Sequence, residues 1–454
     1  MDKTEIILSM VSILMTVISM NNTIWTQQAQ LPDFPNLRGN RKTDVLIVGG
    51  GLAGLLCAWR LQQAGIDYLL IEAERVFGRT SGHTTAKITA QHGLIYDKIF
   101  RRYGAEVARG YFDANWTALG EYRRISCGID CDFETKDNFI YTVNSPFKLE
   151  RELHTLQSLG IPARFADHLP LPVRTEGAVC FSEQAQFHPL KFASAIVGGL
   201  KLLEHTPARA FEGNTVLTDY GRITAERIII ATHFPLINKH GFYFAKQYQN
   251  RSYVISLANG PELNGMYRDE AEEGFSFRNI GTSLLLGGNA HRTGKLSDGW
   301  EPLVRAAEHW YPTARPQYRW AAQDCVTLDG IPYIGKYSRR SHELYVATGF
   351  NKWGMTSAML ASMILTDQIQ GKENPYAHIF SPLRSSLHPQ LAVNLVETTC
   401  NLLRPTVPRC PHLGCALKWN PQEHSWDCPC HGSRFDESGK LLDNPANGDL
   451  KRRP

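Results

Sequence analysis

The chain has 454 residues, enough for two or three domains with substantial cores. Its formal net charge of +4 and its isoelectric point near 8.4 are too mild to indicate a nucleic-acid partner. Six of the ten cysteines are scattered from Cys57 to Cys400. This distribution is typical of a protein in a reducing compartment rather than of a secreted disulfide scaffold. We therefore expect the protein to be cytoplasmic.

The N-terminus carries an apolar run from Ile6 to Met20, interrupted by serines and threonines. It is shorter than the roughly 20 residues that a membrane-spanning helix needs. Acidic neighbours offset the nearby Lys3, which is unlike the basic start of a signal peptide. We therefore expect no membrane association and assign residues 1–42 to an extension. We expect translation to begin at Met20, and the alternative is a membrane anchor.

A nucleotide-binding pattern follows the extension. The apolar strand 44–48 leads into a glycine-rich turn, a helix-like stretch 55–63 and a second apolar strand that ends at Glu72. Gly49 permits the tight turn, Gly51 lets a pyrophosphate approach the backbone, and Gly54 lets helix and strand pack closely. Glu72 lies 18 residues after Gly54, where an acid takes the ribose hydroxyls. The pattern predicts a Rossmann-type α/β domain for a dinucleotide, and by itself it leaves NAD and FAD open.

Three later segments resemble FAD-dependent oxidoreductases of the D-amino-acid oxidase and glycine oxidase type. They are the polar loop 79–87, the strand 227–230 with the following residues 231–233, where His233 replaces the usual glycine, and the glycine-rich turn 348–356. The resemblance covers residues 43 to about 370 and implies FAD as cofactor, with an NAD dehydrogenase as the alternative. Beyond the glycine turn and Glu72, the residues implied to contact FAD are Arg79, Thr84, Thr85, Gly349, Gly354, Met355 and Thr356.

The same resemblance implies a mixed β-sheet that covers the substrate face of the flavin. Candidate pocket residues are Tyr253, Tyr267, Phe275, Phe277 and Arg278. The alternative is a core position for each aromatic residue and a surface position for the arginine. His83 is a candidate for covalent flavin attachment, and a polar loop residue is the alternative.

Two departures from these relatives bear on the reaction. Oxygen-using relatives often carry a lysine on the strand that corresponds to Leu284 to Leu286, so the leucines argue against oxidase activity. A carboxylate-binding lysine of the relatives corresponds to Thr356, which leaves an amino-acid substrate open.

Two short runs near the C-terminus, 410–415 and 428–433, each combine cysteine with histidine at close spacing. Zinc fingers usually pair Cys with Cys and His with His. A diiron cluster in which one iron binds two Cys and the other binds two His needs the mixed pattern found here. The runs resemble a Rieske 2Fe–2S domain, with a zinc site as the alternative.

The Rieske resemblance implies roles residue by residue. Its four cluster ligands would be Cys410, His412, Cys428 and His431. Cys415 and Cys430 would form a disulfide between the loops, and Ser433 would donate its hydroxyl to a cluster sulfur. Phe435 stands where respiratory relatives usually carry a tyrosine, and losing that hydrogen bond should lower the reduction potential.

These expectations divide the chain into three parts after the extension: an FAD-dependent oxidoreductase over 43–380, a linker over 381–404 and a Rieske lobe over 405–454. The lobe is short, so we expect it to lean on the rest of the protein. We also expect flavin to stay bound when the cluster is lost, because the flavin motifs lie in a separate core.

The predicted fold class is α/β, with a mixed β-sheet substrate domain and a small β-rich Rieske lobe. The predicted function is an FAD-dependent dehydrogenase that oxidises a small amine or amino acid by hydride transfer. Electrons would leave through the 2Fe–2S cluster to a one-electron carrier or quinone. The alternatives are a reductase with electrons flowing from cluster to flavin, and a redox sensor or electron-transfer adaptor without turnover.

Overall fold

A computed structural model describes residues 19–20, 23–237, 240–341, 343–385, 387–405 and 408–451. The apolar run lies outside the described residues up to residue 18, and the expected start of translation at Met20 stays a prediction. None of the described helices is long and apolar enough to cross a membrane.

The first sheet has eight strands around a parallel centre, β18–β11–β2–β3–β8, with antiparallel β17 at one edge and the hairpin β9–β10 joined to β11. Its central strands are apolar on both faces, as expected for a parallel sheet covered by helices. Its strands are β2 (Arg41–Val48), β3 (Tyr68–Ile71), β8 (Leu202–Leu203), β9 (Ala208–Glu212), β10 (Thr215–Thr218), β11 (Gly221–Ile230), β17 (Tyr333–Lys336) and β18 (Leu344–Thr348).

Helices cover this sheet, with α10 packed on both α3 and α5. The first half of the chain contributes α2 (Ile24–Gln28), α3 (Leu52–Gln63), the 3₁₀ turn η1 (Thr80–His83), α4 (Tyr96–Tyr103), α5 (Ala105–Ser126), α6 (Phe147–Ser158) and α7 (Pro189–Ile196). The second half contributes α8 (Tyr243–Lys246), α9 (Glu301–Trp310), α10 (Gly354–Ile369), α11 (Ala377–Phe380) and α12 (Pro389–Leu403).

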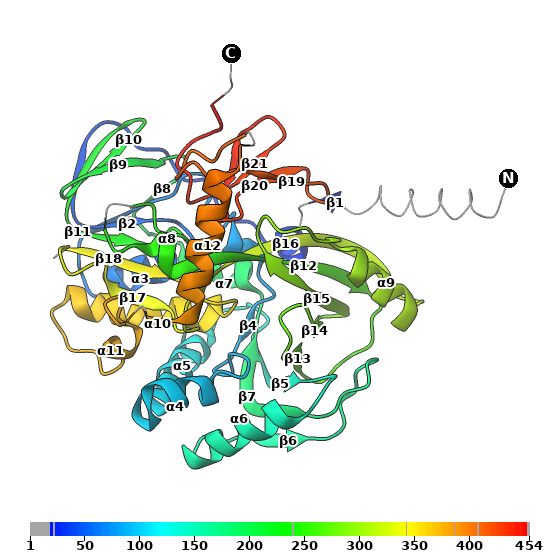
Figure 1. The fold of residues 1–454 in the computed structure, drawn as a ribbon. Helices are drawn as coiled ribbons and strands as arrows, with labels where there is room; N and C mark the ends of the chain where they lie inside the picture. The colour runs from blue at the N-terminus through cyan, green and yellow to red at the C-terminus, as the bar shows by residue number, and fades with distance from the viewer. Residues whose placement is uncertain are drawn as a thin grey trace.

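The second sheet is mixed and has ten strands, in the order β1–β16–β12–β15–β14–β13–β5–β7–β4, with β6 paired to β7. Figure 1 shows it beside the first sheet. Its strands are β1 (Ser19–Met20), β4 (Lys87–Ile88), β5 (Glu134–Tyr141), β6 (Arg164–Ala166), β7 (Ala178–Gln186), β12 (Gln247–Ala258), β13 (Met266–Asp269), β14 (Ser276–Ile280), β15 (Ser283–Arg292) and β16 (Arg315–Thr327).

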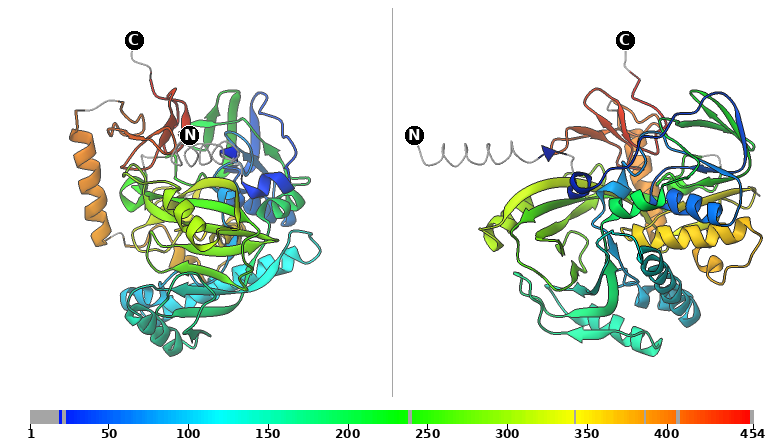
Figure 2. Two further views of the ribbon diagram at one scale, coloured as in Figure 1. Left: turned by 90° about the vertical axis from the view of Figure 1, so that its right-hand side faces the viewer. Right: turned by 180° about the vertical axis from the view of Figure 1, so that it is seen from behind.

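The C-terminal lobe is a four-stranded antiparallel sheet of β19 (Lys418–Asn420), β20 (Ser425–Asp427), β21 (Arg434–Asp436) and β22 (Leu441–Asp443). It has a small core of its own, which includes Phe435. In Figures 1 and 2 the lobe, in red, lies over the junction of the two larger sheets.

The segment 381–404, expected to be a linker, contains the 15-residue helix α12. Figure 2 shows it standing along one side of the molecule. Its buried face carries Asn394 and Asn401, while Leu395, Val396 and Leu403 are exposed. Asn394 donates to the carbonyl of Ala245 at 3.2 Å, so polar contacts hold this helix against the body.

Candidate functional site

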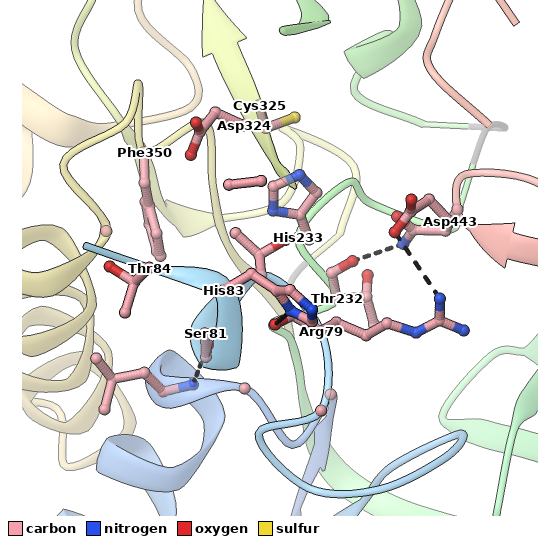
Figure 3. A pocket seen from close by; sticks show the side chains of 18 of the residues that line it. Arg79, Ser81, His83, Thr84, Thr232, His233, Asp324, Cys325, Phe350 and Asp443 are labelled. Atoms are coloured by element: carbon pink, nitrogen blue, oxygen red, sulfur yellow. Dashed lines mark hydrogen bonds and ion pairs between the residues drawn. The ribbon is translucent and has the colours of Figure 1, made fainter. Parts of the chain in front are cut away.

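A cavity of about 500 Å³ lies where the two large sheets and the C-terminal lobe meet. Nine of the eleven residues expected to contact FAD line it: Gly49, Gly51, Glu72, Arg79, Thr84, Thr85, Gly349, Gly354 and Met355. Gly54 and Thr356 do not line it. Figure 3 shows how loops from separate parts of the chain surround this space.

The glycine turn is built as its sequence requires. Gly49 has a φ of +113°, and a Cβ there would lie 2.5 Å from the carbonyl oxygen of Ala231. A Cβ on Gly54 would lie 1.9 Å from the Gly49 carbonyl oxygen, so Gly54 acts in helix packing rather than at the cavity surface. Glu72 accepts hydrogen bonds from the backbone N–H of Gly50 (2.6 Å) and Glu74 (3.0 Å), which fix its carboxylate at the cavity edge.

Thr356 faces away from the cavity. Its hydroxyl is buried against the His92 ring, 2.9 Å from Nε2, and the carbonyl oxygen of Thr89. The His92 ring stacks on Trp353 with centroids 5.0 Å apart, and the Arg268 guanidinium lies 5.7 Å from the Trp353 centroid on the cavity side. Thr356 therefore does not line the cavity, because α10 turns its hydroxyl into the core.

Among the charged residues that line the cavity and that the sequence did not single out are Arg268, Glu272, Asp324 and Lys352. Burial, and then the nearby Arg268, lower the pKa of Lys352 to about 8. Burial raises the pKa of Asp324, against the effect of Lys352, His233 and Arg268. The Lys352 ammonium has no hydrogen-bond partner among the described residues. These four residues bring two cations and two carboxylates to the cavity, an arrangement suited to a zwitterionic or anionic ligand.

Of the five candidate pocket residues, only Tyr253 lines the cavity. Tyr267 stacks on Phe139 with centroids 4.9 Å apart, in the core. Phe275 and Phe277 pack against Trp310.

Arg278, the fifth candidate, is buried and donates to the carbonyl oxygens of Thr85 (2.6 Å) and Ala86 (3.0 Å). It therefore supports the cavity-lining loop from behind. His83 lines the cavity, and its Nδ1 lies 2.9 Å from the Arg79 carbonyl oxygen.

The two C-terminal loops bring together the residues proposed to hold a metal cluster. The thiols of Cys410 and Cys428 are hydrogen-bonded to each other. The rings of His412 and His431 lie 4.9 Å apart between centroids and are nearly perpendicular. Both ring nitrogens of His431 are buried without a hydrogen-bond partner in the described chain. Two converging thiols and two converging imidazoles fit the ligand set of a cluster with two cysteines and two histidines.

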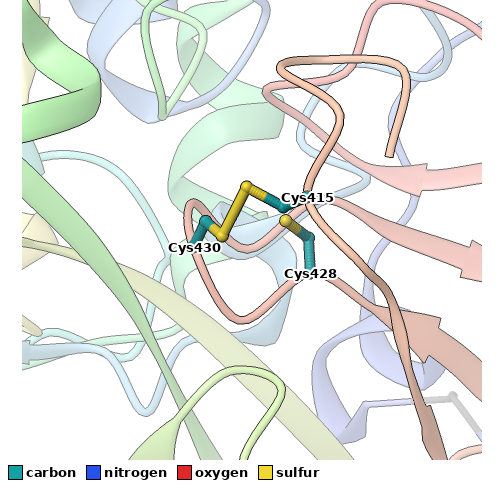
Figure 4. Close-up of side chains that lie close together, drawn as sticks. All are labelled: Cys415, Cys428 and Cys430. Atoms are coloured by element: carbon teal, nitrogen blue, oxygen red, sulfur yellow. A yellow bond between two sulfur atoms is a disulfide. The ribbon is translucent and has the colours of Figure 1, made fainter. Parts of the chain in front are cut away.

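Cys415 and Cys430 form a disulfide, as the Rieske resemblance implied. Figure 4 shows it beside Cys428, whose sulfur lies within 4.8 Å of both disulfide sulfurs. The three sulfurs form a close group, but two of them are bonded to each other, which leaves Cys428 and Cys410 as ligands. The Ser433 hydroxyl lies against the Cys410 thiol and accepts from the Ala446 N–H at 2.9 Å.

The histidine side of the lobe faces the body formed by the two larger sheets rather than solvent. The Phe234 ring lies 6.2 Å from His412 and 6.3 Å from His431, and Phe244 lies 6.1 Å from His431. Only 1% of His431 is exposed. The short lobe therefore leans on the body, in agreement with the sequence-based expectation.

Buried ion pairs hold the lobe in this position. Glu423 of the lobe bonds Arg251 of β12 as well as Arg434 of β21. Arg292 of β15 donates to the carbonyl oxygens of Pro429 (3.2 Å) and Cys430 (3.3 Å) in the second ligand loop. These contacts make the ligand loops part of the same packed structure as the cavity.

The lobe also forms part of the flavin-cavity wall, through Lys440 to Asn444 and Ala446 to Asp449. The amide of Asn444 donates to the carbonyl oxygens of Thr232 (2.6 Å) and Phe234 (3.0 Å), on either side of His233. The hydrophobic core of the lobe is separate from those that carry the flavin motifs, as expected, but the two sites share a cavity wall.

Comparison with known proteins agrees with this architecture. The family of FAD dependent oxidoreductases (DAO) matches residues 44–368, and the Rieske [2Fe-2S] domain matches residues 391–454. The chain is 35% identical to a putative Rieske 2Fe-2S iron-sulfur protein, YhfW, of Bacillus subtilis, over 95% of this chain and 97% of that protein.

Two further relatives lack this full-length match. Gamma-glutamylputrescine oxidoreductase of Escherichia coli is 24% identical over 74% of this chain and 86% of its own. The crystal structure of glycine oxidase from Geobacillus kaustophilus superimposes with a TM-score of 0.62, at 20% identity, over 76% of this chain and 99% of its own.

The chain thus belongs to the DAO family of FAD-dependent oxidoreductases and carries a C-terminal Rieske domain. Its cofactors are FAD and a 2Fe–2S cluster. The predicted fold class is confirmed, including the mixed second sheet and the β-rich lobe. The Rieske match begins at residue 391, so it includes most of α12 within the segment expected to be a linker.

Proposed function

We propose that the protein is an amine or amino-acid dehydrogenase whose electrons leave through the Rieske cluster. The observation that carries this proposal is the docking of the lobe, with His412 and His431 against Phe234 and the lobe in the flavin-cavity wall. A cluster held beside a flavin cavity gives electrons a route that does not depend on oxygen.

In this proposal Cys410, His412, Cys428 and His431 ligate the cluster, and the nine cavity-lining residues named above hold FAD. Gly49 and Gly51 leave room for the pyrophosphate at the start of α3, and Glu72 is placed for the ribose. Gly349 and Gly354 lie at the flavin-ring end. Bound FAD supplies the hydride acceptor, and the protein supplies binding and orientation.

The substrate class rests on the charged residues of the cavity. Arg268 and Lys352 present two cations that can hold a substrate carboxylate, and Trp353 supports the Arg268 guanidinium from below. Two relatives, named for gamma-glutamylputrescine and for glycine, agree with a substrate that carries an amine. Oxidation of the amine to an imine releases two electrons and two protons, and water then hydrolyses the imine.

The leucines on β15 do not by themselves decide between oxidase and dehydrogenase. Leu284, Leu285 and Leu286 are buried and do not line the cavity. Lys352 brings an ammonium group into the cavity from the loop before α10, so a lysine is present after all. The dehydrogenase proposal therefore depends on the docked lobe and not on a missing lysine.

Anaerobic mixing with a panel of amines and amino acids tests the proposal. A substrate should bleach the flavin and produce the electron paramagnetic resonance signal of a reduced Rieske cluster. In air, with a one-electron dye present, two dye molecules should be reduced per imine formed, and little hydrogen peroxide should appear.

The Cys428→Ser variant, which loses a cluster ligand, should keep substrate bleaching and lose most dye reduction. Cys400→Ser, at an exposed thiol on α12, serves as the matched control and should behave as wild type. Stoichiometric peroxide, unchanged by Cys428→Ser, would identify the protein as an oxidase instead.

A further inference from the structure

His233 has a left-handed backbone conformation. It follows β11 where the related flavoproteins usually have glycine, and its φ is +67°. Few residues other than glycine adopt this region, histidine being among the more frequent, and glycine would adopt it without strain. Its carbonyl oxygen accepts from the Thr348 hydroxyl, and Thr348 precedes Gly349 at the flavin-ring end. The ring lines the cavity, as Figure 3 shows.

Gln249 of β12 connects this ring to the second ligand loop. Its side-chain oxygen lies 2.9 Å from His233 Nε2, and its side-chain nitrogen donates to the His431 carbonyl oxygen at 3.0 Å. The same nitrogen donates to the Asn444 carbonyl oxygen at 3.0 Å. Gln249 is 1% exposed, so both ends of its amide are used inside the protein.

The ligand loop can reach Gln249 only because the residue after His431 is glycine. Gly432 has a φ of +83°, and a Cβ there would lie 2.5 Å from the Gln249 Cβ. The contact between β12 and the loop is therefore direct. From cavity to cluster ligand, the path consists of one ring, one amide and the backbone of His431.

We propose that His233 and Gln249 form the electron-transfer bridge between the flavin cavity and the cluster. This inference rests on the proposed function and adds the route. One electron crosses at a time from reduced FAD to the oxidised cluster, one ferric iron becomes ferrous, and the cluster then reduces an external one-electron acceptor. Two such electron transfers reoxidise the reduced FAD, which releases its protons to water.

Gln323 of β16 provides a matched control inside the same interface. Its side-chain nitrogen donates to the Gly432 carbonyl oxygen at 2.9 Å, and its side-chain oxygen accepts from Thr293 at 3.1 Å. It therefore anchors the same loop through one amide, as Gln249 does. It has no hydrogen bond to His233 and does not line the cavity.

Flash photoreduction of the holoprotein tests the bridge without knowledge of the substrate. Under anaerobic conditions, light and a sacrificial tertiary amine reduce the bound flavin, and the appearance of the reduced cluster is followed by optical and electron paramagnetic resonance spectroscopy. Gln249→Leu and His233→Gly should slow cluster reduction by roughly 10-fold or more, the range typical for partners of metal ligands. Gln323→Leu should leave the rate near that of wild type.

Redox titration shows whether a slower cluster reduction comes from loss of the bridge or from a change in the potential of the cluster. The cluster potential of His233→Gly should match that of wild type, because the His233 ring bonds Gln249 and makes no hydrogen bond to the ligand loop among the described residues. Equal cluster-reduction rates in wild type and His233→Gly, or equal slowing by Gln323→Leu and Gln249→Leu, would overturn the bridge. By contrast, a wild-type cluster that never accepts electrons from the flavin would refute the proposed function itself.

Discussion

Lys352 connects the cavity's electrostatics to a measurable pH dependence. Its ammonium lies in the cavity with a pKa lowered to about 8, chiefly by burial and then by Arg268. As the pH rises through about 8, the free protein loses this charge, so KM for a carboxylate-bearing substrate should rise. Losing one charge-assisted hydrogen bond to the substrate corresponds to an increase in KM of roughly 10-fold.

Steady-state kinetics with matched substrates check this assignment. Lys352→Met should show a raised KM at pH 7 and no further rise above pH 8. An uncharged ester of the same amino acid should be insensitive to the substitution. If Lys352→Met keeps the alkaline rise in KM, the titrating group lies elsewhere.

The same lowered pKa has a consequence for stability. The unfolded chain keeps the Lys352 proton up to its ordinary pKa of 10.5, whereas the folded protein releases it near 8. The unfolded state therefore binds more protons between these values, and the contribution of Lys352 to folding becomes more favourable as the pH rises through this window.

At the scale of elements, the turn between β19 and β20 holds the lobe on the body through Glu423. Burial alone would raise the pKa of this carboxyl, but Arg251 and Arg434 lower it to about 2. Since the ordinary pKa is 4.5, the stabilisation is fully present above about pH 4.5 and is lost as the pH falls towards 2. Glu423→Gln should remove roughly 3 kcal/mol from docking of the lobe, because it leaves Arg251 with a weakened partner.

Urea titration of the holoprotein, followed by tryptophan fluorescence at pH 7 and at pH 3, measures this effect. The difference between wild type and Glu423→Gln should be large at pH 7 and should shrink at pH 3. Glu437→Gln is the control, since Glu437 pairs with His424 at the surface, with 63% of its side chain exposed, and should change little. An equal effect of the two substitutions would contradict the docking role of Glu423.

The sequence was sufficient to predict those elements that depend on a local pattern of residue types. The glycine turn before α3 and the two cysteine–histidine loops each need particular residue types at fixed spacing, and the structure places them as expected. Helix α12 was missed because its inward face is polar, with Asn394 and Asn401, so its apolar residues gave no reason to place it against the body.

The pocket residues were predicted less well because successive side chains along a strand point to opposite faces of the sheet. On β13, Tyr267 was chosen, yet it enters the core and the adjacent Arg268 faces the cavity. On β14, Phe277 was chosen, whereas Ser276 lines the cavity. A one-residue error in position along a strand moves the side chain to the opposite face. Only the three-dimensional packing of the sheet fixes which face meets the flavin.

For the whole molecule, the shared wall predicts that the two cofactors influence each other's retention. Asn447 and Arg209 bond across the gap between lobe and first sheet, and both line the flavin cavity. Cluster-free protein from iron-starved cells should therefore exchange bound FAD for isotope-labelled FAD faster than cluster-loaded protein does. Filtration and mass spectrometry of the bound flavin measure this exchange, and equal rates in the two forms would show that the lobe does not confine the nucleotide.

The position of residues 440–449 across the cavity also bears on how the protein matures. During synthesis the glycine turn at residue 49 leaves the ribosome long before the lobe, and domains generally fold from the N-terminus onward. The nucleotide can enter while its cavity is still open on one side, and docking of the lobe then closes it. We therefore expect a preferred order of loading, flavin before iron, in which a chain that docks its lobe without flavin closes around an empty cavity.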